Sequence, residues 1–449
     1  MIRTKRDKKH IYLLVLLLLL GIGFAALAAT LKINGTITID SARWDVHFEN
    51  VSVTPGSVTA TTVPVSDNTT TTEMTYAASF TQPGDYYEFT TDIANDGTIN
   101  AMVDLVTNKT YQADGETEKQ LPAYLKSTVT YNDGTPINKN HLLAKQTSEK
   151  IKVRVEFKTD VNPGDLPSSA ETTVFKFVVK YKQADKNACQ RPTTFQADSW
   201  DTIQCNVRNN PLSYPLGAEK TIEIDIDGDN TNETYTLRVA NNTTPAECST
   251  QGFSQTACGF VVEFKEIIDM HRMNLYYDGT TNGDGAHGGW EYSDMRAYLN
   301  DGIYAKENID YSNNGIYSKL PSELQNVIIT TTVVSSHGYS QSDNFTTTDK
   351  LYLLSPAEIW EQVPGYDEAR TDTAWNLSRQ LDYYHSIGVT TSSYSNAKKN
   401  YKGYANYYWL RAAYSGNNDR FNMVSSTGYN YQGYYSASRY GVSPAFRIG

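Results

Sequence analysis

The chain has 449 residues, 39% of them apolar and 20% charged, which excludes global disorder and provides enough apolar residues for two or three folded units. Its formal net charge is −11, and beyond the basic first ten residues it has 34 basic against 49 acidic residues. This acidic balance argues against nucleic acid as a partner, because phosphate binding needs clustered positive charge. Tyrosine is overrepresented, with 33 Tyr against 14 Phe, and 23 of the tyrosines follow residue 270.

The N-terminus predicts export. Five Lys or Arg residues among the first ten precede an uncharged stretch, residues 11–31, which as a helix reaches about 31 Å and spans the hydrocarbon core of a bilayer. Basic residues on its N-terminal side favour a cytoplasmic start with the rest of the chain outside. Residues 26–28 (ALA) also fit a signal cleavage site. Residues 1–29 are therefore either a transmembrane anchor in the cell membrane or the signal peptide of a secreted protein.

The four cysteines agree with export to an oxidising compartment. They form two close pairs without the C-x-x-C spacing of zinc or thioredoxin sites. We expect disulfides between Cys189 and Cys205 and between Cys248 and Cys258, although sequence proximity only favours this connectivity and free buried thiols remain the alternative.

Residues 30–183 show the period-2 alternation of strands that bury one face. The clearest strands are residues 31–40, 43–49, 151–158 and 175–181, separated by turn sequences such as Asn-Asp-Gly at residues 95–97. The Thr-rich residues 59–72 are expected to form a loop or a polar edge. The pattern predicts an antiparallel β-sandwich.

Residues 82–89 (QPGDYYEF) and 93–101 (IANDGTINA) resemble the camelysin/TasA-like family of exported bacterial jelly-roll proteins of biofilm fibres. The resemblance implies a β-sandwich and assembly by strand exchange. Some camelysins are classed as metallopeptidases, but the chain lacks H-E-x-x-H. His47 lies on the polar face of its predicted strand, where a solvated side chain is expected rather than a ligand. Peptidase activity is therefore not carried over.

Residues 184–195 are predicted to be a linker, and residues 196–449 a second domain of α+β type. Ile222, Ile224 and Ile226 open a hairpin, and the opposite face holds acidic residues. Asp225, Asp227 and Asp229 are weak candidates for calcium ligands, because an EF-hand loop would need Gly at 230 and Glu at 236, where the chain has Asn230 and Thr236. Solvated strand residues are the alternative.

Three helix starts are predicted further along. Ser293 can cap a helix with Met295, Tyr298 and Leu299 on one face. Pro321 can open a second helix, through residue 328. Residues 355–358 (SPAE) form a capping box after a short predicted strand, residues 351–354.

Four segments resemble a domain of unknown function common on exported proteins of Firmicutes and their relatives. They are residues 289–300 (GWEYSDMRAYLN), 348–355 (TDKLYLLS), 408–411 (YWLR) and 441–448 (GVSPAFRI). The domain is more distantly similar to the formylglycine-generating-enzyme branch of the C-type-lectin-like fold, which implies that fold for residues 196–449. That branch uses cysteines in the C-terminal part of the domain, and residues 259–449 contain none. No catalytic constellation or cofactor motif is recognised, so we expect no enzyme activity and no cofactor.

The tryptophans of these segments are expected to be core anchors. Arg296, Arg411 and Arg447 are expected to form buried ion pairs or bonds to backbone rather than ligand contacts. The terminal stretch, residues 394–449, places eleven tyrosines among Ser, Gly and Asn, a composition typical of binding loops. The candidate ligand-binding residues there are Tyr408, Tyr429, Tyr431, Tyr434 and Tyr435. Replacement of Phe by Tyr in the core is the alternative.

These features predict a non-enzymatic surface or secreted binding protein whose ligand is a glycan or a protein. A structural subunit of a matrix or fibre is the second possibility. A formylglycine-generating type of enzyme is the third, and it would need a thiol or metal centre that the sequence does not identify.

Overall fold

The structure is a computed structural model. It describes residues 42–58, 71–167, 172–276, 285–338, 343–361, 375–414 and 416–449. The predicted membrane or signal segment, the predicted strand at residues 31–40 and most of the Thr-rich segment lie outside these residues. Among the described residues, no helix has the length and apolar character needed to span a membrane.

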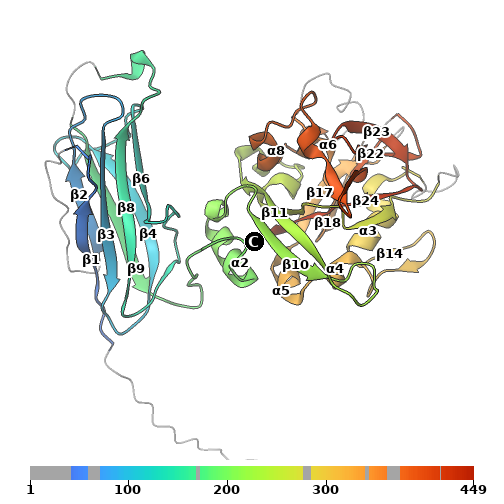
Figure 1. The fold of residues 1–449 in the computed structure, drawn as a ribbon, viewed down its shortest axis with the longest axis horizontal. Coiled ribbons are helices and arrows are strands. Elements are labelled where there is room, and N and C mark those ends of the chain that lie inside the picture. Colours follow the sequence, from blue (N-terminus) through green and yellow to red (C-terminus); the bar gives the residue numbers. More distant parts are fainter. Residues whose placement is uncertain are drawn as a thin grey trace, which may run out of the picture. The chain divides into compact units, whose positions relative to one another are not determined.

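The protein is mainly β, with several antiparallel sheets and few helices (Figure 1). Two sheets built from residues 46–183 share one hydrophobic core. The first has the order β1 (Val46–Val53), β3 (Tyr86–Asn95), β8 (Thr147–Phe157) and β6 (Leu125–Tyr131). The second has the order β2 (Thr71–Ala77), β9 (Val174–Gln183), β4 (Ala101–Tyr111) and β5 (Glu118–Lys119), with β7 (Leu142–Leu143) also paired to β4.

Alternation decides which side of these strands is buried. Ile151, Val153 and Val155 of β8 are fully buried, and their sequence neighbours are partly exposed. After β8, the turn sequence Pro-Gly-Asp forms the 3-10 helix η1 (Pro163–Asp165). The strands predicted at 43–49, 151–158 and 175–181 are therefore confirmed, with ends shifted by a few residues.

A second core contains buried residues from Phe195 to Ile448. One of its sheets has the order β10 (Glu219–Ile224), β11 (Glu233–Thr243), β12 (Gly259–Phe264), β25 (Ala445–Ile448) and β16 (Ile328–Ile329). The other has the order β13 (Asp269–Arg272), β24 (Arg439–Val442), β21 (Tyr408–Ala413), β22 (Arg420–Val424) and β23 (Asn430–Tyr435). Three two-stranded sheets complete it: β14 (Ile303–Tyr304) with β15 (Ile309–Asp310), β17 (Thr331–Ser336) with β18 (Asn344–Asp349), and β19 (Lys399–Tyr401) with β20 (Tyr404–Asn406).

The helices of this part are short. They are α2 (Trp200–Asn209), α3 (Asp294–Leu299), α4 (Ile316–Lys319), α5 (Ser322–Val327), α6 (Pro356–Ile359) and α8 (Asp382–Ser386). Three of them, α2, α3 and α6, begin at a serine. Ser293 accepts the N–H of Arg296 at the start of α3, and the predicted capping box of Ser355 with Glu358 opens α6. The helix predicted after Pro321 is α5, although Ile328 already belongs to β16.

Two local expectations need correction. Residues 351–354 do not form a regular strand, because only Tyr352 pairs, through an isolated bridge to Ala445. Helix α2 was not predicted, although Ser199 caps it and Trp200, Ile203 and Val207 are buried on one face. The two disulfides have the predicted connectivity, Cys189 with Cys205 and Cys248 with Cys258.

Candidate ligand-binding site

A cavity of about 590 Å³ lies beside α3. Its wall combines the end of the 3-10 helix η5 (Gly289–Tyr292), α3, the β14 segment and the last two residues of β18. Two of the four sequence segments that indicated the domain family therefore meet at this cavity. A second hollow of about 760 Å³ adjoins α2 and β10, but its lysine, Lys220, already donates to the carbonyl oxygens of Gln196 and Asp198.

Arg296 is the polar centre of the cavity. Its Nε donates to Asp349 Oδ1 at 2.7 Å, and its Nη1 donates to the carbonyl oxygen of Glu291 at 3.2 Å. The Arg296 side chain keeps 29% of its surface exposed, whereas that of Asp349 keeps 1%. Because a guanidinium is a rigid planar fork, fixing one side of it also orients the N–H groups that remain.

Asp349 is itself held by two hydrogen bonds, so it fixes the position of Arg296. Trp290 Nε1 donates to Asp349 Oδ2 at 2.9 Å, and Thr347 Oγ1 donates to the same oxygen at 2.8 Å. Trp290 is fully buried, as expected for a core anchor. The tryptophan thus connects the hydrophobic core to the orientation of Arg296.

Local backbone geometry brings η5 against the neighbouring strand. Gly289 has φ +63°, and a Cβ there would lie 2.3 Å from the carbonyl oxygen of Ser336 in β17. Only glycine fits both the conformation and the space. This close approach places Glu291 and Tyr292 at the edge of the cavity.

The mouth of the cavity combines polar and apolar side chains. Tyr292 is 48% exposed and Ile303 is 63% exposed, which is high for residues of this type. The Glu291 side chain is 31% exposed and lies 3.5 Å from His337 Nε2. The site therefore offers a carboxylate acceptor, guanidinium donors and two apolar surfaces.

The hydroxyl of Ser293, which lines the cavity, is engaged in local backbone bonds. Its Oγ donates to the carbonyl oxygen of Trp290 and accepts the N–H of Arg296, so it serves as a helix cap. A serine nucleophile instead needs a base within hydrogen-bond reach to remove its proton. The arrangement can hold a ligand through hydrogen bonds and ring contact.

The predicted tyrosine face is divided in the structure. Tyr408 is 1% exposed, and its hydroxyl donates to the carbonyl oxygen of Ala397, so this candidate belongs to the core and not to a ligand-binding surface. Tyr429 is 40% exposed and packs edge-on against Tyr394 at 5.2 Å. The side chain of Tyr431 lies outside the described residues.

Tyr434 and Tyr435 occupy another part of the surface. Tyr435 is 38% exposed and lies 6.2 Å from the ring of Tyr276, and Arg420 stacks over it at 4.8 Å. Tyr434 is half-buried and contacts both Tyr435 and Tyr440. The tyrosines are thus divided: Tyr408 is a core residue, Tyr429 and Tyr435 are partly exposed, and ligand binding by the exposed ones stays a prediction.

The acidic turn after β10 brings together the three weak calcium candidates. One carboxylate oxygen each from Asp225, Asp227 and Asp229 lies within 4.8 Å of the others. Asp225 also accepts the N–H groups of Gly228 and Asn230, and Asp229 accepts that of Thr231. These bonds make the carboxylates acceptors within the turn itself, and calcium binding stays a prediction.

Two buried charge clusters lie in the second part of the chain. Arg411 and Glu358 are both fully buried and paired through Nη1–Oε2 (2.7 Å) and Nη2–Oε1 (2.5 Å) contacts, in line with the expected structural role of Arg411. Glu263 bonds Lys399 and Arg238. Burial alone would raise the pKa of Glu263, but these two cations lower it to about 2. Arg447 is largely buried, and burial lowers its pKa.

Sequence reasoning identified some parts of the site and missed their combination. Arg296 was expected in an ion pair, and it has one with Asp349. The importance of Glu291 and Asp349 was not predicted, although both lie in the segments that indicated the domain family. Their position in these segments is the sequence signal from which both residues could have been found.

The fold and the cavity define a mainly β protein with a ligand-sized site in its second part. Residues 265–449 form a domain that matches the family described as Domain of unknown function (DUF6273). The match includes the cavity and all four sequence segments, whereas β10, β11 and β12 precede it. Neither the curated proteins nor the solved structures provide a match.

Proposed function

We propose that the protein is a non-enzymatic bacterial surface or secreted protein that binds a glycan through the Arg296 cavity. The observation that carries this proposal is a guanidinium fixed by a buried carboxylate, with Glu291 and the exposed ring of Tyr292 beside it. A protein ligand is the alternative occupant.

The chemistry of the cavity favours a polyhydroxylated ligand. A sugar hydroxyl both donates and accepts hydrogen bonds, so neighbouring hydroxyls can bond Arg296 and Glu291 at the same time. The cavity wall includes two acidic and two basic residues, which suits a ligand without strong net charge. The C–H face of a sugar ring can cover Tyr292 while the polar groups are satisfied.

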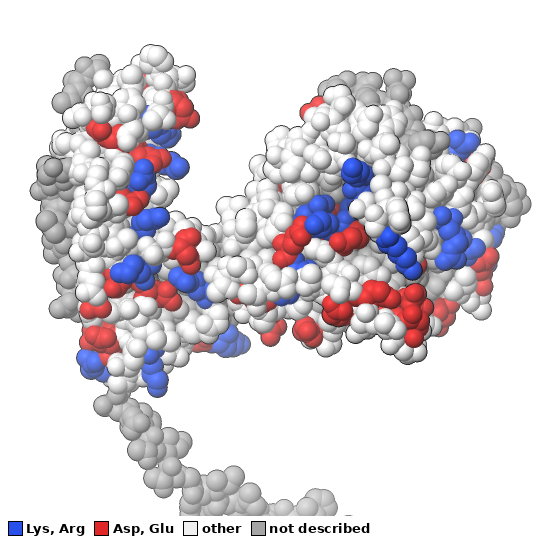
Figure 2. Space-filling view, in the orientation of Figure 1, with Lys and Arg blue, Asp and Glu red and all other residues white. Residues whose placement is uncertain are grey.

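The charge distribution also fits such a ligand. On the face shown in Figure 2, acidic side chains of the second part of the chain gather along its lower edge, and basic side chains lie in separate groups above them without forming one broad positive area. Nucleic-acid binding would favour one broad positive area. A glycan partner agrees with this surface.

The remaining features supply a location and a scaffold. The N-terminal segment would anchor the chain to the cell membrane or direct its secretion. Residues 30–183 would form a TasA/camelysin-like β-sandwich, supported by two sheets around one core. Residues 196–449 would adopt a C-type-lectin-like fold that displays the cavity.

A glycan array probed with the full chain in mild detergent tests the proposal. Arg296→Gln and Tyr292→Ala should each lower the affinity for the recognised glycan by at least tenfold, a loss of about 1.4 kcal/mol. Tyr404→Ala is the matched control, because Tyr404 is 81% exposed and does not line the cavity. Unchanged binding in both cavity variants, or no glycan bound by the folded wild type, would refute it.

A structural fibre subunit is the second candidate. Strand β1 forms an edge of its sheet among the described strands and exposes Val51 (38%) and Val53 (51%) near its end. An edge of this kind can pair with a strand of another copy. The proposal predicts concentration-dependent filaments in electron microscopy, which Val53→Lys should suppress. A monomer at every concentration would exclude it.

A further inference from the structure

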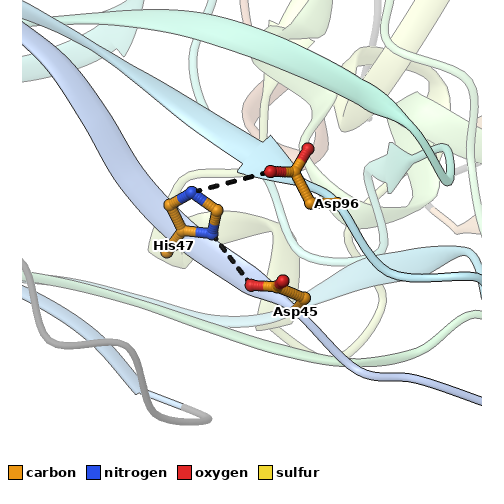
Figure 3. A group of neighbouring side chains, drawn as sticks. All are labelled: Asp45, His47 and Asp96. Carbon is orange, nitrogen blue, oxygen red and sulfur yellow. Dashed lines mark hydrogen bonds and ion pairs between the residues drawn. The ribbon is translucent and has the colours of Figure 1, made fainter.

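We propose that His47 and Asp96 form a binding site for one late first-row divalent metal ion such as Zn²⁺, with Asp45 orienting the histidine. The three side chains converge at one end of the first sheet (Figure 3). His47 is in β1, Asp45 precedes this strand, and Asp96 follows β3. This differs from the expected solvated histidine, since the His47 side chain is only 19% exposed and contacts an acid on each side.

Backbone pairing fixes the position of the three residues. Strands β1 and β3 are antiparallel, with Val46 opposite Asn95, so Asp45 and Asp96 extend from the same end of the sheet. The N–H of Asp96 donates to the carbonyl oxygen of Asp45 at 2.9 Å. Gln146, directly before β8, also donates from Nε2 to the carbonyl oxygen of Asp96 at 2.7 Å, which holds the turn after β3.

Asp45 sets the orientation of the imidazole. Its Oδ1 lies 3.0 Å from His47 Nδ1, and its Oδ2 accepts from Arg43 Nη1 at 2.7 Å. A neutral imidazole that donates from Nδ1 has a lone pair on Nε2. Carboxylates commonly hold metal-binding histidines in this way, which fixes the ring and makes the free nitrogen a better ligand.

The distance on the other side of the ring fits a metal ion. His47 Nε2 lies 4.0 Å from Asp96 Oδ2. This exceeds the reach of a direct hydrogen bond, about 3.2 Å, and two acceptors facing each other favour a cation between them. Zinc bonds of about 2.1 Å to each atom would separate the atoms by about 3.4 Å in tetrahedral geometry and about 4.2 Å in a straight line. The observed gap lies between these limits.

The surrounding charges and the donor set narrow the choice of ion. Glu49 and Asp92 lie opposite each other further along β1 and β3 and add negative charge. Lys150 forms an ion pair with Asp92, and Arg43 forms one with Asp45. An imidazole with a carboxylate suits Zn²⁺, Ni²⁺ or Cu²⁺, whereas Ca²⁺ and Mg²⁺ prefer oxygen ligands. Water would complete the coordination, so the site would be open to exchange.

Isothermal titration of metal-free full chain with Zn²⁺ tests the proposal. The wild type should bind one Zn²⁺ equivalent that His47→Gln and Asp96→Asn abolish, and Asp45→Asn should weaken its binding 10- to 100-fold. His337→Gln is the matched control, because His337 also lies between two acids but at 3.3 and 3.5 Å, without a comparable gap. It should keep this equivalent, as should Asp225→Asn in the acidic turn.

Co²⁺ provides an independent measurement that does not depend on a variant. In wild-type protein it should broaden the NMR signals of His47 and of residues 95–97 first. The proposal would be overturned if His47→Gln left Zn²⁺ binding unchanged, or if binding were lost only in the two control variants. It would also be overturned if the wild type bound no Zn²⁺ up to millimolar concentration, or if Co²⁺ broadened signals elsewhere.

Discussion

The buried ion pair between Arg411 and Glu358 gives a direct test of how the second core is stabilised. Glu358→Gln keeps the size of the side chain but removes the charge that balances a guanidinium with no exposed surface. Arg411 would keep its 2.8 Å bond to the carbonyl oxygen of Leu353 and its 3.2 Å bond to Thr256 Oγ1. Neither partner supplies the missing negative charge.

We expect the free energy of unfolding to fall by about 3–5 kcal/mol, the range for breaking one side of a buried pair. Urea unfolding followed by tryptophan fluorescence measures this, because five of the six tryptophans lie after residue 196. Glu247→Gln is the control: Glu247 pairs with Arg379 but is 52% exposed, so its loss should cost less than about 1 kcal/mol. A loss below 1 kcal/mol for Glu358→Gln would refute the reasoning.

Three further predictions concern acid, the second disulfide and the glycine beside the cavity. Burial lowers the pKa of His141 from 6.5 to about 4, so the unfolded chain binds the proton more readily and stability should fall by about 3 kcal/mol as the pH drops from 6.5 to 4. His141→Gln should remove this slope in urea titrations at successive pH values, and an unchanged slope would contradict it. Replacing Cys248 and Cys258 by serine opens a loop of sequence separation 10 and should cost about 3 kcal/mol, seen as a lower thermal midpoint; an unchanged midpoint would argue against a structural role. Gly289→Ala should destabilise the protein much more than Gly403→Ala, because a Cβ at Gly403 meets no atom within 4 Å, and equal thermal shifts would contradict the close packing of η5.

Local signals in the sequence predicted the parts of the fold that depend on neighbouring residues. Ser293 and the Ser355–Glu358 capping box mark the starts of α3 and α6 because each cap needs only the next three residues. The pairing of Cys248 with Cys258 likewise follows from short separation. Helix α2 had a usable signal, since Ser199 is a cap and its buried residues have helical spacing.

The sites depend on contacts that no local pattern contains. Asp349 meets Arg296 from 53 residues away, and Asp96 meets His47 across two strands. The alternation rule placed His47 on the outer face of its strand but gave no information about the turn that lies beside it. Tyr408 fits the composition of a binding loop, yet its position in β21, at the centre of a sheet, makes it a core residue.

The position of β25 has a consequence for the order in which the protein can fold. This strand, Ala445–Ile448, lies between β12 and β16 and is joined to both. The carbonyl oxygen of Gly449, directly after it, also accepts bonds from Gln204 and Arg208 of α2. Ribosomes release β12 about 180 residues before its partner, so the sheet stays open during most of synthesis. Removal of residues 445–449 would therefore leave β12 and β16 without the strand that joins them, and α2 without its two bonds to Gly449.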